Sequence, residues 1–168
     1  GRRRRRFSFD QLVALSSPTW SPDGAAVALA GARRSGRTDL FLVDAGTGEL
    51  SALTDDLYHD RDPHWHPARD VLVFSSDRSP GHGRKGKYNL FTIDVGEAAE
   101  RSVRQLTFGD HHDMQPAWSP EGARVAFTSD RDGFYDLYAL PVAGDSVGTT
   151  QRLTRALTGV FDAAWLPG

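Results

Sequence analysis

The four tryptophans of this 168-residue chain stand in four copies of one motif, and this repetition limits the possible folds more than any other feature. The copies are Pro18-Thr19-Trp20-Ser21-Pro22-Asp23-Gly24, Pro63-His64-Trp65-His66-Pro67, Pro116-Ala117-Trp118-Ser119-Pro120-Glu121-Gly122 and Ala163-Ala164-Trp165-Leu166-Pro167. Successive tryptophans are 45, 53 and 47 residues apart. Self-similarity at such a period is typical of repeat architectures, in which each repeat is one supersecondary unit.

Shorter features follow each of the first three tryptophans in a constant order. The apolar runs are Val27-Ala28-Leu29, Leu72-Val73-Phe74 and Val125-Ala126-Phe127, and then Asp39–Val43, Asn89–Ile93 and Asp136–Leu140. Two units contain the same tripeptide, Ser76-Asp77-Arg78 and Ser129-Asp130-Arg131. The units close with Leu53-Thr54, Leu106-Thr107 and Leu153-Thr154, each threonine 11 residues before the next tryptophan. Chance does not keep this register three times, so we expect three equivalent structural units.

The residue types of one unit predict four short antiparallel strands. Pro-Asp-Gly after the tryptophan is turn chemistry, because proline presets φ and glycine takes a left-handed conformation. The apolar runs are short, rich in β-branched or aromatic residues, and apolar at consecutive positions, which suits a sheet covered on both faces. Only Asp10–Leu15 has much helical character. The sequence therefore predicts an all-β fold.

A four-stranded sheet repeated every 40 to 50 residues is typical of a β-propeller, in which each blade packs on its neighbours. We expect one partial propeller domain at residues 7–168, after a basic terminal segment at 1–6. Full blades are predicted at about residues 16–54, 61–107 and 114–154, and the start of another at 160–168. Because propellers close with four to eight blades, the chain is expected to be part of a larger, six-bladed ring that the rest of a parent chain completes.

These motifs resemble the PD40 (WD40-like) repeat of TolB-type β-propellers, which carries a P-x-W-S-P-D-G turn, an apolar strand ending in Ser-Asp-Arg, an aromatic strand and a closing Leu-Thr. The resemblance covers roughly residues 7–168. Unit two departs from it, because His66-Pro67-Ala68-Arg69 replaces Ser-Pro-Asp-Gly. We therefore predict either a positive φ at Arg69 or a rebuilt turn, since a left-handed arginine costs about 1 kcal/mol.

Composition excludes several functions. The chain has no cysteine, which rules out a thiol nucleophile, Cys-ligated zinc, an iron–sulfur cluster and a disulfide. The net charge of −2 includes Arg2–Arg6, and without them 15 basic and 22 acidic residues give −7. This balance argues against nucleic acid as the main partner. No stretch approaches the roughly 18 consecutive apolar residues of a membrane span, so we expect no membrane insertion.

A His-Asp pair recurs before two of the tryptophans, as His59-Asp60 and His112-Asp113. Imidazole and carboxylate groups gathered near the mouth of a propeller channel can bind a divalent metal, so these four residues are candidate metal ligands. The alternative is that they cap turns and bond to neighbouring backbone. For the recurring Ser-Asp-Arg we favour a structural role, in which Asp caps the turn and Arg pairs with an acid on an adjacent strand.

Two further sets of residues are candidates for partner binding. Three residues before each tryptophan stand Ser17, Asp62, Gln115 and Asp162, which should lie at one height on successive blades. A basic loop in unit two carries His82, Arg84, Lys85 and Lys87. This loop matches G-x-G-x-x-G literally, but a strand rather than a helix follows it, so a dinucleotide site is not expected.

No nucleophile elbow or H-E-x-x-H helix is present, and the carboxylates follow the repeat, so we predict no catalytic residues and no cofactor in this chain. The leading hypothesis is a non-catalytic module for protein or peptide recognition. The resemblance to TolB implies a larger bacterial envelope protein with a periplasmic or other extracytoplasmic location. The alternative is the accessory propeller of a peptidase resembling prolyl oligopeptidase, because Phe9–Leu15 followed by Ser-Pro-Asp-Gly is similar to the start of those propellers.

Overall fold

The structure is a computed structural model that describes the chain except residues 1–4, 79–85, 97–101, 157, 163 and 166–168. Its described residues form strands and no helix. The strands are β1 (Leu12–Trp20), β2 (Ala26–Arg33), β3 (Thr38–Asp44), β4 (Leu50–Ala52), β5 (Asp60–Trp65), β6 (Val71–Ser76), β7 (Asn89–Asp94), β8 (Val103–Gln105), β9 (Asp113–Trp118), β10 (Arg124–Ser129), β11 (Asp136–Ala143), β12 (Ser146–Val147) and β13 (Gln151–Arg152). None of the described segments is a helix long and apolar enough to cross a membrane.

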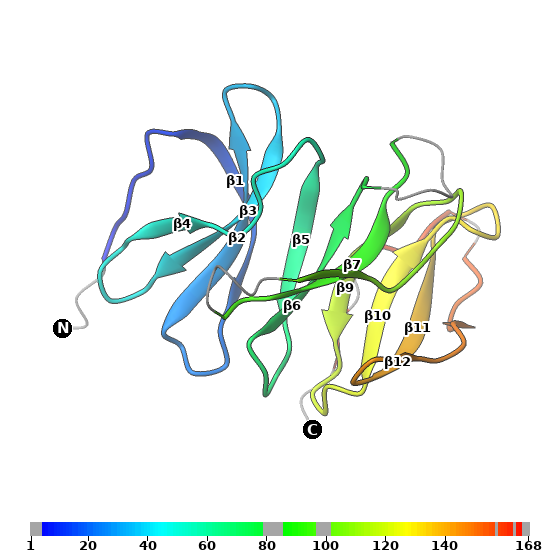
Figure 1. The fold of residues 1–168 in the computed structure, drawn as a ribbon. Coiled ribbons are helices and arrows are strands. Elements are labelled where there is room, and N and C mark those ends of the chain that lie inside the picture. The colour runs from blue at the N-terminus through cyan, green and yellow to red at the C-terminus, as the bar shows by residue number, and fades with distance from the viewer. Residues whose placement is uncertain (1–4, 79–85, 97–101, 157, 163, 166–168) are drawn as a thin grey trace.

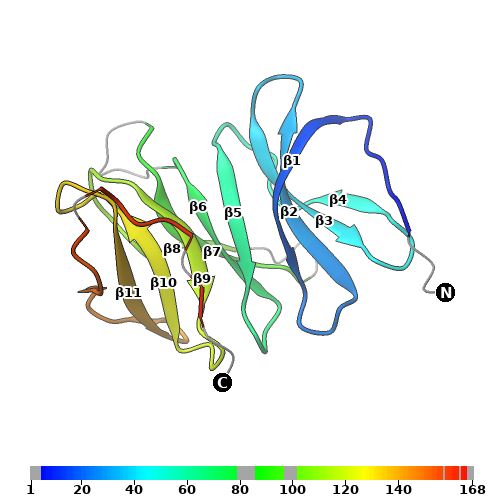
Figure 2. The ribbon, with the colours of Figure 1, turned by 180° about the vertical axis from the view of Figure 1, so that it is seen from behind.

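The strands make three antiparallel sheets that stand side by side as blades (Figures 1 and 2). Blade one has the order β1-β2-β3-β4 and blade two the order β5-β6-β7-β8. Blade three has β9, β10 and β11, and both β12 and β13 pair with β11 at its outer side. The expected all-β propeller fold is confirmed. Segment Asp10–Leu15 is not helical, because pairing with β2 draws Leu12–Leu15 into β1 and overrides the local propensity.

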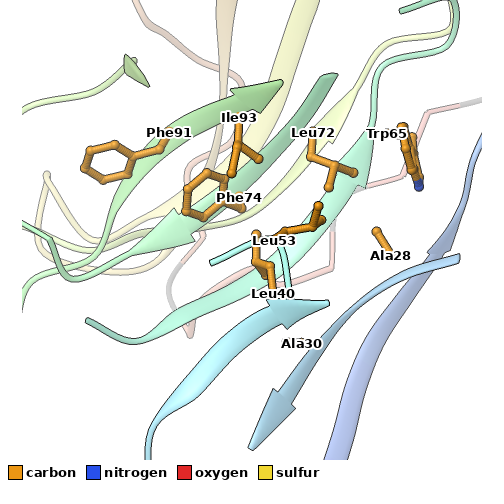
Figure 3. Packing of buried hydrophobic residues seen from close by; sticks show 9 residues of the cluster. All are labelled: Ala28, Ala30, Leu40, Leu53, Trp65, Leu72, Phe74, Phe91 and Ile93. Atoms are coloured by element: carbon orange, nitrogen blue, oxygen red, sulfur yellow. The ribbon is translucent and has the colours of Figure 1, made fainter. Parts of the chain in front are cut away.

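Two hydrophobic clusters lie between blades, and a third, made of Leu29, Phe41 and Val43, lies on blade one under Phe9 and Leu12. The cluster between blades one and two contains Ala28, Ala30, Leu40, Leu53, Trp65, Leu72, Phe74, Phe91 and Ile93 (Figure 3). A second cluster joins blades two and three through Val73, Leu90, Leu106, Trp118, Val125, Phe127, Tyr138, Leu140 and Val142. Because blade two is covered on both faces, its strands need apolar residues at consecutive positions, which is the pattern of Leu72-Val73-Phe74.

The turn after the tryptophan differs between blades as the sequence predicts. In blades one and three, Gly24 (φ 70°) and Gly122 (φ 69°) take the left-handed conformation. In blade two, Arg69 has no positive φ and the turn is rebuilt. The Val71 amide donates to the Arg69 carbonyl at 2.8 Å, and the imidazole of His66 accepts the Ala68 amide at 3.1 Å. A three-residue turn therefore replaces the glycine-dependent one without a strained arginine.

Candidate functional site

The four residues three positions before the tryptophans share one unusual backbone conformation. Ser17, Asp62, Gln115 and Asp162 have φ values of 50°, 54°, 53° and 56°, and they are all of the positive-φ non-glycine residues in the described chain. At the first three, the pairing of the innermost strand with its neighbour shifts register, so each lies in a β-bulge. A left-handed conformation costs a non-glycine residue about 1–2 kcal/mol. The fold repeats this cost on every blade.

Side chains of these residues pair from one blade to the next. Ser17 Oγ donates to Asp62 Oδ1 at 3.1 Å, and Gln115 Nε2 donates to Asp162 Oδ1 at 2.7 Å. The Asp162 amide also donates to Gln115 Oε1 at 3.2 Å. The structure thus brings the predicted partner-binding residues Asp62, Gln115 and Asp162 together with Ser17 along the inner edge of the blades.

A hollow of about 920 Å³ opens beside this inner edge. Its walls come from all four copies of the tryptophan motif, and they include Trp20, Trp65, Trp118 and Trp165. The prolines that flank these tryptophans and the four left-handed residues complete the wall. A second hollow of about 450 Å³ is also lined by Ser17, Asp62 and Gln115, together with Arg61 on β5. Three of the four left-handed residues therefore line both hollows, and Asp162 lines the larger one.

The joint between blades two and three differs from the other joints, because it contains His64 of β5 and His66 of the following turn. Elsewhere the indole of one blade donates to the preceding blade, as Trp65 Nε1 does to the Thr19 carbonyl at 3.2 Å. The buried indole nitrogen of Trp118 has no partner. Instead the Trp118 backbone amide lies 3.3 Å from His64 Nδ1, and the His66 ring meets the Trp118 ring edge-on at 4.8 Å between centroids. This joint depends on imidazole groups.

Both histidines favour the neutral form. Burial lowers the pKa of His64, and only a hydrogen bond to the Trp65 carbonyl opposes this. Burial also lowers the pKa of His66, and the nearby charge of Arg69 lowers it further. Since both pKa values lie below the ordinary 6.5, the two rings carry little charge at pH 7. The acidic side chains that line the larger hollow are Asp62 and Asp162.

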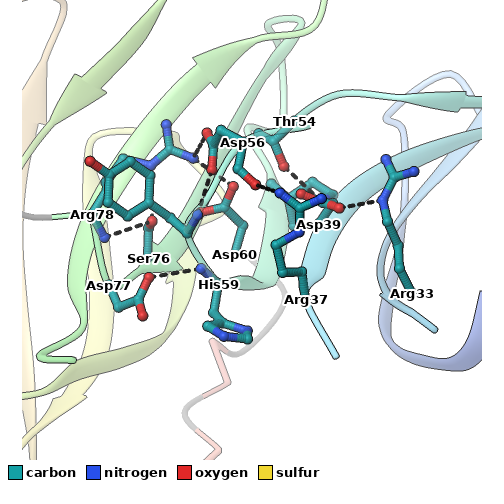
Figure 4. Close-up of polar contacts among 12 residues, drawn as sticks. Arg33, Arg37, Asp39, Thr54, Asp56, His59, Asp60, Ser76, Asp77 and Arg78 are labelled. Atoms are coloured by element: carbon teal, nitrogen blue, oxygen red, sulfur yellow. Dashed lines mark hydrogen bonds and ion pairs between the residues drawn. The ribbon is translucent and has the colours of Figure 1, made fainter. Parts of the chain in front are cut away.

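The duplicated His-Asp pairs occupy structural positions at the ends of β5 and β9. Asp60 accepts a hydrogen bond from Arg78 Nη2 at 2.6 Å, and Asp113 accepts two from Arg131 at 2.8 and 3.0 Å. Both carboxylates are fully buried. Figure 4 shows the Asp60 group, in which Arg78 also bonds to Asp56 at 2.8 Å. The arginine of each Ser-Asp-Arg therefore pairs with an acid on another strand.

The histidines of these pairs take part through their backbone amides. The His59 amide donates to Asp77 Oδ1 and the His112 amide to Asp130 Oδ1, each at 2.7 Å. The aspartate of each Ser-Asp-Arg thus accepts a backbone amide from the segment that leads into the inner strand, 18 residues earlier in the chain. In the parts of the chain that the structure describes, no three His, Asp or Glu side chains form a group that could hold a metal ion. Metal binding by His59, Asp60, His112 and Asp113 stays a prediction.

The two buried aspartates differ in their electrostatics. Burial raises the pKa of Asp60 more than the charge of Arg78 and its hydrogen bonds lower it. Burial acts in the same direction on Asp113, but the contact with His111 and the charge and hydrogen bonds of Arg131 outweigh it, so the pKa of Asp113 is lowered. His111 Nε2 lies 3.3 Å from Asp113 Oδ2. Asp113 is therefore better compensated than Asp60.

Most of the predicted basic loop lies outside the described residues, namely His82, Arg84 and Lys85. Lys87 is described and half-buried, and its charge helps burial to lower the pKa of His112. His64 and His66 are not repeated, because blade one has Thr19 and Ser21, and blade three has Ala117 and Ser119, at the equivalent positions. Their only signal was the unusual density of histidine around Trp65.

The comparisons with known proteins agree with this architecture. No protein-family model matches the chain. An uncharacterized protein of Agrobacterium fabrum is 25% identical over 150 residues, which cover 88% of this chain and 44% of that protein. A proposed TolB of Agrobacterium tumefaciens has a TM-score of 0.73 at 22% identity, over 91% of this chain and 51% of that one.

TolB from Acinetobacter baumannii has a TM-score of 0.67 at 23% identity, over 87% of this chain and 33% of that one. A structure from a study of two prolyl endopeptidases has a TM-score of 0.60 at 21% identity, over 89% of this chain and 23% of that one. The chain spans about half the length, or less, of the proteins that it matches. Together with the three sheets and their repeated inner-strand bulges, these likenesses show that the chain has the fold of a TolB-type β-propeller.

Proposed function

We propose that the chain is a non-catalytic propeller module that binds a protein or peptide segment in the hollow at the inner edge of its blades. The observation that carries this proposal is the repeated left-handed backbone at Ser17, Asp62, Gln115 and Asp162. Strained residues persist where the surrounding fold enforces them, and they gather at binding sites. Here the strain places polar side chains from four consecutive motifs in the walls of one hollow.

The walls of the hollow suit a peptide. Tryptophan and proline supply apolar area, and the carboxylates, the Gln115 amide and the Ser17 hydroxyl supply a few hydrogen-bonding groups, which is the usual composition of a binding pocket. Its volume of about 920 Å³ is of the size that pockets for small ligands and side chains have. The described lining contains no Lys or Arg, while Asp62 and Asp162 are acidic. We therefore expect segments with a lysine or arginine to bind best.

A selection from a displayed library of random peptides tests the proposal. We expect enriched peptides to bind the wild-type chain and to lose at least tenfold in affinity when Asp62→Asn and Asp162→Asn are combined. The matched control is Asp145→Asn, because that carboxylate is fully exposed at the outer side of blade three. Enrichment of no peptide, or of peptides whose affinity the paired substitution leaves unchanged, would contradict the proposal.

A second candidate is the accessory propeller of a peptidase, which the likeness to a prolyl endopeptidase structure favours. The same hollow would then meet substrate peptides, and the catalytic residues would lie in another domain. Peptidase assays on a longer protein that contains this chain separate the two candidates. Likeness to TolB makes an extracytoplasmic bacterial location part of the first candidate.

A further inference from the structure

The smaller hollow at the inner edge, of about 450 Å³, differs from the larger one in its charge. Its walls include the residues four positions before the tryptophans, namely Ser16, Arg61, Met114 and Phe161. Arg61 is the one Lys or Arg among the described residues that line either hollow. Asp62, the next residue on β5, lines both hollows, and Asp162 lines the larger one. The inner edge therefore places one positive charge beside its negative charges.

The repeat does not require an arginine at this position. The equivalent side chains on the other blades carry a hydroxyl group, a thioether and an aromatic ring. The arginines that do recur, Arg78 and Arg131, pair with the buried acids Asp60 and Asp113. Arg61 is exposed, and within the described part of the chain it forms no ion pair and donates no hydrogen bond. Its N–H groups are therefore free to bind a ligand.

Tyr88, which precedes β7, holds the guanidinium group of Arg61 at the hollow. Arg61 Cζ lies over the Tyr88 ring, 4.9 Å from its centroid, which is the distance of a cation–π contact. Contact with a ring occupies the flat face of a guanidinium group, whereas its N–H donors point outward in the plane. Two such donors match the two oxygens of a carboxylate. Arg61 is thus positioned to bind a carboxylate.

We propose that the smaller hollow binds the carboxyl terminus of a peptide through Arg61, while Asp62 and Asp162 bind a basic side chain of the same peptide. This inference rests on the proposed function and adds the direction in which the peptide lies. The carboxylate would pair with the guanidinium group, and the chain would run from there along the inner edge toward the tryptophans. Opposite charges on the two partners would then meet at both places.

The composition of the smaller hollow favours a carboxyl terminus over an acidic side chain. Beside Arg61, its walls contain the apolar side chains of Ala14, Ala32, Met114 and Phe161. A carboxylate alone would leave these walls without a partner. A terminal residue with an apolar side chain offers both a carboxylate and an apolar group, whereas Asp and Glu offer only the carboxylate. We therefore expect an apolar residue at the carboxyl terminus of the peptide.

The length of the inner strand sets the place of the basic residue. Trp65 follows Arg61 by four residues on β5, which is about 13 Å of extended chain. A peptide with its carboxyl terminus at Arg61 would therefore lie beside this edge with about its last four residues. The carboxylates of Asp62 and Asp162 belong to the same stretch. We expect the lysine or arginine of the peptide within those residues.

Retention of synthetic peptides on the immobilised chain tests the proposal. Two mixtures of short random peptides, acetylated at the amino terminus, differ only in the carboxyl terminus, which is an acid in one and an amide in the other. Mass spectrometry identifies the retained peptides, which are then synthesised singly in both forms. We expect each acid to bind about tenfold more tightly than its amide, as for a charge-assisted pair. The retained acids should share the expected apolar terminal residue and nearby basic residue.

Substitution of Arg61 separates a binding role from a structural one. Arg61→Gln should weaken binding of the acids and leave binding of the amides unchanged, so that the preference disappears. Loss of a merely structural arginine would weaken both forms equally. The matched control is Arg34→Gln, because Arg34 is also exposed but follows β2 outside the lining of both hollows. This variant should keep the preference for acids.

The outcomes distinguish this inference from the proposed function. Equal affinities of acids and amides for the wild-type chain, or a preference that persists in Arg61→Gln, would overturn the inference. If binding then still depended on Asp62 and Asp162, the proposed function would stand. Peptides that need an internal Asp or Glu and bind equally as acid and amide would also overturn the terminal assignment. Retention of no peptide from either mixture would overturn both proposals.

Discussion

The pair of Arg78 and Asp60 offers the sharpest test of how the blades are held together. Asp60 is fully buried, its pKa is raised by burial, and Arg78 is its charged partner at 2.6 Å. Removing one member of a buried pair costs about 3–5 kcal/mol, because the other charge stays buried without compensation. Arg78→Met keeps much of the aliphatic length of the side chain over Phe74 and Phe91 and removes only the charge and its hydrogen bonds. We expect a loss of about 3–5 kcal/mol in the free energy of unfolding at pH 7.

The equivalent change on blade three provides a matched comparison. Arg131→Met should cost less than Arg78→Met, because Asp113 keeps His111 at 3.3 Å and its pKa is lowered rather than raised. Asp60→Asn should partly rescue Arg78→Met, since it removes the uncompensated charge. Urea titrations at one fixed chain concentration give these free energies. A loss below about 0.5 kcal/mol for Arg78→Met, or equal losses for both arginines, would refute the reasoning.

Three other predictions concern the turns and the inner edge. The pKa values of His64 and His66 are lowered in the folded state, so the stability that these side chains contribute is complete above the unfolded pKa of about 6.5 and falls as the pH drops below it. Unfolding titrations from pH 7 to pH 5 should show this decline. A wild-type pH profile that matches the profile of His64→Gln would contradict it. Gly24→Ala should cost about 1 kcal/mol, because of its positive φ alone, since Gly24 has open space around it. Gly122→Ala should destabilise the fold more, because a Cβ on Gly122 would also lie 2.5 Å from the His66 ring. Asp62→Gly should relieve backbone strain, so the protein should unfold at an equal or higher temperature. The affinity for selected peptides should fall. A clear loss of stability would show that Asp62 has a structural role instead.

The sequence allowed the blades to be predicted because their determinants are local and repeated. Turn residues, apolar runs and the closing Leu-Thr recur at fixed distances from Trp20, Trp65 and Trp118, so each unit supports the assignment of the others. The structural role of Ser-Asp-Arg was predictable for the same reason. The rebuilt turn at His66–Arg69 was expected as one of two outcomes, and the energetic cost of a left-handed arginine accounts for the outcome that the structure shows.

The positive φ values at the inner edge could not be predicted from the residue types. Ser, Asp and Gln are not the glycines that signal a positive φ, so only their equal distance from the tryptophans marked them as a set. The His-Asp pairs attracted a metal hypothesis because sequence spacing does not show that Arg78 and Arg131 reach Asp60 and Asp113 from another strand. The joint of His64 with Trp118 spans 54 residues of chain, and its chemistry has no equivalent in the other blades.

The most direct measurement follows the indole N–H resonances of the protein by nuclear magnetic resonance while a selected peptide is added. The chain has four tryptophans, and all four line the proposed hollow. Peptide binding in that hollow should shift indole signals of several blades, and the shifts should disappear in the Asp62→Asn, Asp162→Asn variant. Binding that leaves all four indole signals unchanged would place the peptide elsewhere and contradict the account.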